Sequence, residues 1–247
     1  MLFTYKRSVT YLTVIAILLL AIFIQGIAPP KAMAAPLYSC GDLQNNHCYA
    51  VVGWSGLVNG ADTRIGTRGI TGGGCGVNTE MWLLDSTSTY WVEAGITAQI
   101  NLNNNTPTLF WADNRPGGGF HNHFSGPLVS GDYGANALTR ITLSGSNTYN
   151  ISISAPITNF SGVSTNSFVN PDGIWIGMEL CGSQGASVPP VGITNNRWLD
   201  GVGGWHYQTT DAPVISLNSP ANGYWFARPS QSSTGGDWSV CIIGAGC

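Results

Sequence analysis

The chain has 247 residues, of which 43% are hydrophobic and only 9% are charged, with a formal net charge of −3 at pH 7. Three of its basic residues lie within the first 31 positions, which leaves six arginines against twelve acidic residues afterwards, a formal charge of −6. This acidic balance argues against nucleic acids and anionic membrane surfaces as partners. With so few cations, little self-repulsion develops when carboxylates are protonated, so folding at low pH is compatible with the composition.

The N-terminus has the pattern of a secretory signal. Lys6 and Arg7 precede an apolar stretch from about Tyr11 to Ile24, and Ala32-Met33-Ala34 gives a small-x-small cleavage site. We therefore expect residues 1–34 to be a signal peptide and the remainder to be secreted, without stable membrane association. An uncleaved anchor is the alternative, because the apolar stretch is long for a signal peptide and short for a membrane span.

The cysteines predict disulfides rather than metal ligation. All six follow the expected cleavage site, and an even number outside the cytoplasm favours bridges. They are Cys40, Cys48, Cys75, Cys181, Cys241 and Cys247. Six cysteines allow fifteen pairings, of which the short loop between Cys40 and Cys48 is the first choice. No CxxC spacing is present, so zinc-ribbon and thioredoxin-type sites have no support, and we expect neither a metal nor a cofactor.

Short β-like runs separated by Gly, Asn and Ser fill the rest of the chain, and helical periodicity is nearly absent. The runs Glu80–Asp85 and Tyr90–Ala98 flank a polar segment of hairpin-loop length, so they are predicted to pair. The other predicted strands cover residues 48–54, 108–113, 137–143, 148–154, 167–169, 174–180, 223–227 and 238–243. This pattern predicts one all-β domain over residues 35–247, an antiparallel β-sandwich resembling a jelly roll, which we expect to be monomeric.

Two polar segments are interpreted as connections. Gly56–Gly76 is glycine-rich without helical periodicity, and within it Gly72–Gly76 is predicted to form a turn or an extended connection, since it lacks the Lys-Ser/Thr ending of a phosphate loop. Phe120–His123 is predicted to be a surface loop with solvated imidazoles. Binding of a metal by His121, His123 and Asp113 is the weaker alternative.

The chain contains only three glutamates, Glu80, Glu93 and Glu179, and each lies in a run with tryptophan. Alternation in a strand gives the two later runs one apolar face each and one mixed face. The mixed face of the first run holds Trp91, Glu93, Gly95, Thr97 and Gln99, and that of the second holds Trp175, Gly177 and Glu179. The apolar faces hold Val92, Ala94, Ile96 and Ala98, and Ile174, Ile176, Met178 and Leu180.

These mixed faces suggest a shared carboxylate site. An unpaired carboxylate is costly to bury unless it is protonated or partnered, so two such strands in a chain poor in charge favour a common function. The alternative is that Glu93 and Glu179 simply face water from the solvent side of a sheet. Depletion of glutamate in strands, the cost of exposing tryptophan and the room left by the glycines all count against that alternative.

The order of these runs resembles the domain of the neprosin glutamic peptidases over about residues 78–181. The resemblance rests on Trp91-Val92-Glu93-Ala94-Gly95, then residues 106–111 with a glycine-rich continuation, then Ile174–Glu179. Gly177-Met178-Glu179 stands where the family has Gly-Gly-Glu, and the family's aromatic-Cys-Tyr-Asn segment is absent. The resemblance implies a secreted β-sandwich that hydrolyses peptide bonds at acid pH, with Glu93 and Glu179 as the catalytic pair.

The predicted substrate is therefore a polypeptide. We expect Trp91, Trp175, Gln99, Gly95 and Gly177 to line its binding site, and the role of Glu80 stays open. Two carboxylates held close cannot both ionise easily, so one can act as a base on water while the other donates a proton. The alternative is a non-catalytic carbohydrate-binding or surface-recognition module, suggested by nine tryptophans, nine tyrosines and many Asn and Gly loops.

Overall fold

The computed structural model describes residues 47–72, 76–165, 167–181, 187–208, 215–217, 224–230 and 237–242. Within them lie fifteen β-strands and two short 3-10 turns, Asn103–Asn105 and Ser130–Asp132. The strands are β1 (His47–Ser55), β2 (Gly60–Gly66), β3 (Gly76–Leu84), β4 (Trp91–Ala98), β5 (Thr108–Arg115), β6 (Gly119–Pro127), β7 (Asn136–Leu143), β8 (Tyr149–Ser154), β9 (Asn159–Ser164), β10 (Gly173–Cys181), β11 (Val191–Leu199), β12 (Trp205–Tyr207), β13 (Ile215–Leu217), β14 (Tyr224–Ser230) and β15 (Asp237–Ile242). In this part of the chain no helix is long and apolar enough to cross a membrane.

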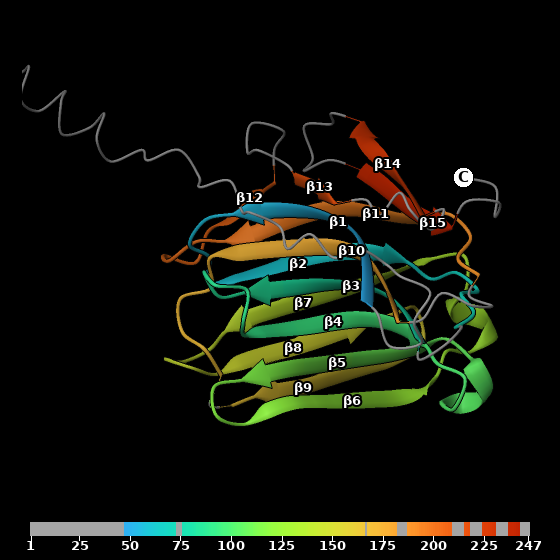
Figure 1. Cartoon of the computed structure of the whole chain (residues 1–247), viewed down its shortest axis with the longest axis horizontal. Helices are drawn as coiled ribbons and strands as arrows, with labels where there is room; N and C mark the ends of the chain where they lie inside the picture. Colours follow the sequence, from blue (N-terminus) through green and yellow to red (C-terminus); the bar gives the residue numbers. More distant parts are fainter. Residues whose placement is uncertain are drawn as a thin grey trace, which may run out of the picture. The chain divides into compact units, whose positions relative to one another are not determined.

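Two antiparallel sheets form the predicted sandwich, so the all-β prediction is confirmed. One sheet has seven strands in the order β13-β1-β10-β3-β4-β5-β6, and the other has eight in the order β14-β15-β11-β2-β7-β8-β9. Figure 1 shows the two layers, with β10, β3, β4 and β5 side by side in the first. The predicted hairpin between β3 and β4 is also present, with Trp82 opposite Glu93.

The core lies between the sheets and is built from the apolar faces that alternation predicts. All eight of those side chains belong to one buried cluster, which also takes in residues of the second sheet such as Ile141, Ile151 and Ile193. Because side chains alternate along a strand, burying these residues directs Glu93 and Glu179 to the opposite, outer face of the seven-stranded sheet. The core therefore fixes where the carboxylates lie.

Several sequence predictions were wrong in detail. Residues 60–66, for which no strand was predicted, form β2, a central strand of the eight-stranded sheet. Residues 120–123 belong to the edge strand β6 rather than to a loop, although their side chains are exposed as expected. Residues 167–169 form no strand. β9, β11, β12 and β13 were not predicted either.

Some predictions fall outside the described residues. These are the signal peptide over residues 1–34 and, among the cysteines, Cys40, Cys75 and Cys247. The extent of the domain and the pairing of the cysteines stay predictions.

Candidate active site

All three glutamates of the chain meet at one place. Glu80, Glu93 and Glu179 are each buried, and one carboxylate oxygen from each lies within 4.8 Å of the others. They come from three adjacent strands, Glu179 from β10, Glu80 from β3 and Glu93 from β4. The structure thus brings the predicted pair together and adds Glu80, whose membership the sequence left open.

Glu80 lies on the strand between the other two glutamates, and its register places glycine on both sides. Gly95 of β4 and Gly177 of β10 are its direct cross-strand partners. A Cβ atom at Gly95 would lie 2.6 Å from the Glu80 Cβ, and one at Gly177 would lie 2.1 Å from the Ala50 carbonyl oxygen. Gly95 therefore lets β4 approach β3 closely beside Glu80, and Gly177 lets β10 approach β1 closely. Their predicted contact with a substrate stays a prediction.

Glu179 has polar partners that hold it in the ionised form. Its Oε1 lies 2.5 Å from His47 Nδ1, and its Oε2 accepts a hydrogen bond from Asn78 Nδ2 at 3.1 Å. The Tyr49 hydroxyl also hydrogen-bonds this carboxylate. Burial would raise the pKa of Glu179, but the hydrogen bond and charge of His47, together with hydrogen bonds from Tyr49 and Glu80, outweigh it, so the pKa lies below the ordinary value.

The pKa values of Glu80 and Glu93 are shifted in the opposite direction from that of Glu179. Burial is the main cause that raises the pKa of each well above the ordinary value, and the negative charge of Glu179 adds to it. For Glu80 the charge of Glu93 contributes as well. Both carboxylate oxygens of Glu80 are buried and make no hydrogen bond of regular geometry with the described residues, although hydrogen bonding with Glu179 and Asn78 contributes to the pKa. The cluster therefore holds one carboxylate, Glu179, and two protonated carboxylic acids in the acidic range.

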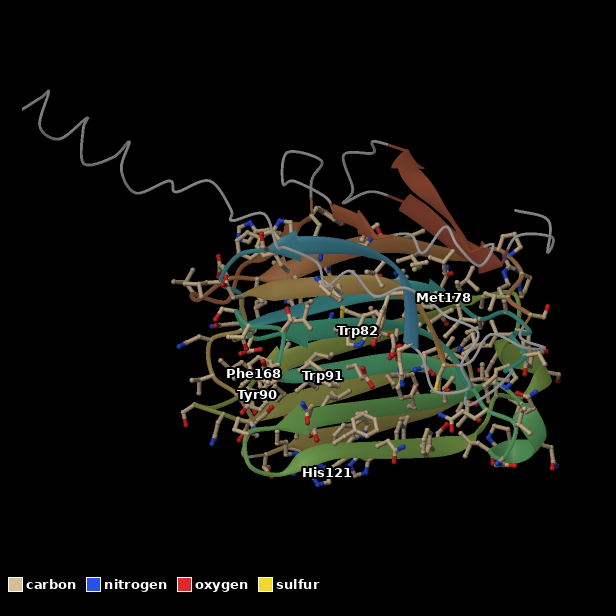
Figure 2. All side chains as sticks on the ribbon, viewed as in Figure 1. Trp82, Tyr90, Trp91, His121, Phe168 and Met178 are labelled. Atoms are coloured by element: carbon tan, nitrogen blue, oxygen red, sulfur yellow. The ribbon has the colours of Figure 1, made fainter. Side chains whose placement is uncertain are left out.

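Aromatic side chains surround the glutamates on the outer face. Trp82 and Trp175 form a small buried cluster with Val51 and Leu84, and Tyr49 and Trp91 pack against it. The Tyr49 ring lies edge-on to both of these indoles, with centroid distances of 6.1 and 6.4 Å. Figure 2 shows Trp82 and Trp91 on neighbouring strands near the middle of the sheet. This surround keeps water from screening the charges within the cluster.

The other predicted site residues are placed as follows. Trp91 is half-buried beside the glutamates, and Trp175 is 6% exposed. Gln99 follows the end of β4, and its amide donates to Thr97 Oγ1 at 3.3 Å rather than to the glutamates. The part of Gln99 in substrate binding stays a prediction.

The histidines considered for metal binding lie elsewhere. His121 faces Asp113 across β5 and β6, on the opposite face from Glu93, and Figure 2 shows it at the edge of the sheet. Asp113 accepts from Arg115 Nε at 2.8 Å, and the His123 ring stacks on Trp111 at 3.9 Å. Both interactions are structural. The three glutamates offer carboxylate oxygens, the ligands that hard cations prefer. Protons on Glu80 and Glu93 and the contact of Glu179 with His47 already reduce the negative charge of the cluster, which weakens its attraction for a cation.

Sequence reasoning missed His47, Tyr49 and Asn78. The first two belong to β1, which pairs with β10 so that Tyr49 stands opposite Glu179. Asn78 stands opposite Glu179 on the other side, from β3. These pairings join segments that lie about a hundred or more positions apart in the chain. Of these three residues, only Asn78 could have been placed near the glutamates from sequence, because it lies two positions before Glu80 and alternation puts both side chains on one strand face.

The fold is similar to that of glutamic peptidases of solved structure. Scytalido-glutamic peptidase with a transition-state-analogue inhibitor matches with a TM-score of 0.57 and 14% identity, over 79% of this chain and 98% of that one. The same peptidase with a peptide-based analogue gives 0.53 and 12%, over 81% and 98%. SCP-B, a member of the eqolisin family of peptidases in complex with the tripeptide Ala-Ile-His, gives 0.53 and 14%, over 81% and 98%.

No family model matches the sequence, and no curated protein matches it. At such low identity the structural likeness establishes the fold alone. The chain therefore has the β-sandwich fold of glutamic peptidases.

Proposed function

We propose that the protein is a secreted, acid-acting glutamic endopeptidase in which Glu93 and Glu179 activate water against a peptide bond. The observation that carries this proposal is that buried carboxyl oxygens of Glu93 and Glu179 lie within 4.8 Å of each other, in surroundings that raise the pKa of Glu93 and lower that of Glu179. Such a pair supplies a base and an acid at the same pH. The resemblance to the neprosin peptidases and the peptidase fold support the same reaction.

The surroundings of each carboxyl suggest its role. Glu179 stays ionised because His47 and Asn78 stabilise its negative charge, so it accepts a proton from the attacking water. Glu93 keeps its proton because of burial and the neighbouring charge of Glu179, so it donates that proton to the leaving nitrogen. The water oxygen forms a bond to the carbonyl carbon, the carbon–nitrogen bond breaks, and the products are a carboxylic acid and an amine.

An acidic working range follows from the same geometry. Glu93 must be protonated to act as an acid, and its proton is lost as pH rises through its raised pKa. At low pH, Glu179 stays ionised because its pKa lies below the ordinary value. Activity therefore requires a pH between these two pKa values, which gives a bell-shaped profile.

The carbohydrate-binding alternative finds less support in the tryptophans near the glutamates. A sugar-stacking platform needs an exposed aromatic face, whereas Trp82 and Trp175 are 4% and 6% exposed. This alternative predicts binding to glycans with no proteolysis at any pH between about 2 and 7.

The decisive test is digestion of a mixed protein substrate at acid pH by the wild type and by Glu179→Gln, followed by mass spectrometry of the peptides. The wild type should cleave internal bonds, and the variant should lose at least about 10³-fold of the rate, the scale of a lost general base. A chelator should leave the wild-type rate unchanged. Full activity in Glu179→Gln would show that this carboxylate is not the base.

A further inference from the structure

The third glutamate has no role in the reaction as written, although it lies between the two that do. Glu80 is 0% exposed, and no hydrogen bond of regular geometry reaches its carboxylate oxygens, although hydrogen bonding with Glu179 and Asn78 contributes to its pKa. A fully buried carboxyl whose hydrogen bonds are poorly formed destabilises the fold relative to an apolar side chain. Such a cost is typical of groups that are retained for function.

Glu80 has glycine at the paired position on both neighbouring strands. Its neighbours at the same register are Gly95 and Gly177, so no side chain separates it from β4 or β10. One of its oxygens lies within 4.8 Å of an oxygen of Glu93 and of Glu179. A side-chain hydrogen bond between Glu80 and Glu179 contributes to the pKa of both groups, and the charge of Glu93 contributes to the pKa of Glu80.

After the proposed reaction, the protonation states of Glu93 and Glu179 are the reverse of those needed to begin the next turnover. After one turnover Glu179 carries the proton taken from water, and Glu93 has given its own to the amine. Both are buried, at 7% and 5% exposure, so direct exchange with solvent is restricted. The pair needs a route by which a proton returns from Glu179 to Glu93 before the next turnover.

We propose that Glu80 is a proton-relay residue that resets the Glu93–Glu179 pair after each turnover. Its carboxylic acid donates its proton to the Glu93 carboxylate and accepts the proton held by Glu179. Glu80 ends in the form in which it began, Glu93 is an acid again and Glu179 is a carboxylate again. The inference rests on the proposed peptidase activity, and Glu80 acts through the pair without touching the substrate.

The charged and titratable groups near Glu80 leave no other candidate among the described residues. From β10 it faces Glu179, and from β4 it faces Glu93. From β1, the Tyr49 hydroxyl has a pKa raised far above its ordinary value by burial, so it does not titrate in the acidic range. His47 contacts Glu179 and not Glu93, and half of its side chain is exposed. It can hold Glu179 but cannot carry a proton across to β4.

Rapid-quench kinetics on a peptide substrate at acid pH separate the relay from the chemistry. The first turnover needs no reset, so in Glu80→Gln the steady-state kcat should fall at least about tenfold more than the first-turnover rate does, each relative to the wild type. Glu80→Asp, which keeps a carboxyl, should recover part of that loss. An unchanged steady-state rate, or equal losses in both phases, would overturn the relay while leaving the peptidase assignment intact.

A second measurement does not depend on activity. Because the chain has only three glutamates, labelling the glutamate carboxyl carbons with ¹³C gives three signals, all from this cluster. The relay requires that Glu80→Gln shift the titration of both remaining signals, since the three groups share protons. If either signal titrates as in the wild type, the relay is wrong. A wild type that cleaves no peptide would instead refute the proposed function itself.

Discussion

Glu179 Oε1 lies 2.5 Å from His47 Nδ1, and this contact helps to lower the pKa of Glu179, whereas the pKa values of Glu80 and Glu93 are raised. The same contact raises the pKa of His47. The imidazole is therefore a cation throughout the acidic range. An ion pair with one partly exposed member is screened by water, so we expect its main effect on the ionisation of Glu179 rather than on stability.

His47→Ala should move the acid limb of the activity profile to higher pH. Without the imidazole, burial and the neighbouring carboxyls raise the pKa of Glu179, so its carboxylate is lost at a higher pH than in the wild type. The pH dependence of kcat/KM for a peptide substrate measures this shift. His206→Ala is the matched control, because His206 contacts Asp200 at 2.8 Å on the surface, away from the glutamates. An acid limb that stays in place would mean that His47 does not control Glu179.

The protein should be more stable at about pH 4.5 than at neutral pH. Glu80 and Glu93 bind protons more tightly in the folded state than in the unfolded state, so their contribution is present below the unfolded pKa and is lost as pH rises through the folded pKa. His47, whose pKa is also raised, adds to this loss at higher pH. Glu179 acts in reverse and loses its contribution as pH falls through its lowered pKa.

Urea denaturation between pH 3 and 8 measures this dependence. Each unit of pKa difference between the folded and unfolded states corresponds to about 1.4 kcal/mol. Glu80→Gln should flatten the decline on the neutral side, because it removes one of the protons released there. A free energy of unfolding that rises steadily from pH 4.5 to 7.5 would contradict the raised pKa values.

Glu93→Gln should remove activity without lowering stability. The amide keeps the shape of the side chain and removes the titrating group, so stability near neutral pH should rise slightly as repulsion with Glu179 is relieved. In contrast, Ile176→Ala on the core face of β10 should cost about 2 to 5 kcal/mol by leaving a cavity, since Ile176 is fully buried. Thermal denaturation and peptide cleavage, measured on both variants, separate the two effects. A strongly destabilised Glu93→Gln would indicate a structural role.

The sequence predicted the faces of β4 and β10 because alternation is a local property of a strand. Once Val92 and Ile176 are in the core, Glu93 and Glu179 must point the other way. That Glu80 joins them depends on register, because β3 must pair with β4 and β10 so that glycine stands on both sides. Register over such long separations is set by the whole core and is not encoded in one segment.

Missed strands have a related cause. Residues 60–66 mix glycine, charged and β-branched residues, so they lack the apolar pattern of a buried strand. Asp62 is charged in sequence, and only the folded sheet supplies the partners that allow it to be buried. There it accepts from Arg140 and Arg197, which come from the two flanking strands, at 2.8 and 2.6 Å. β6 is an edge strand with exposed side chains, so it lacks the alternating burial that reveals a strand in sequence.

Gly95→Ala should destabilise the fold and misplace Glu80 together. An added Cβ would lie 2.2 Å from the Thr79 carbonyl oxygen and 2.6 Å from the Glu80 Cα, both on the adjacent strand, so β3 and β4 would have to separate. Overpacking of this kind costs about 1 to 3 kcal/mol. Gly192→Ala in β11 is the matched control, because nothing lies within 4 Å of an added Cβ there, and it should change stability by no more than about 0.5 kcal/mol. Urea denaturation compares the two variants, and the ¹³C signals of the three glutamates report whether the cluster has moved. Equal stabilities, with unshifted glutamate signals in Gly95→Ala, would show that the close approach of β3 and β4 is not required to position Glu80.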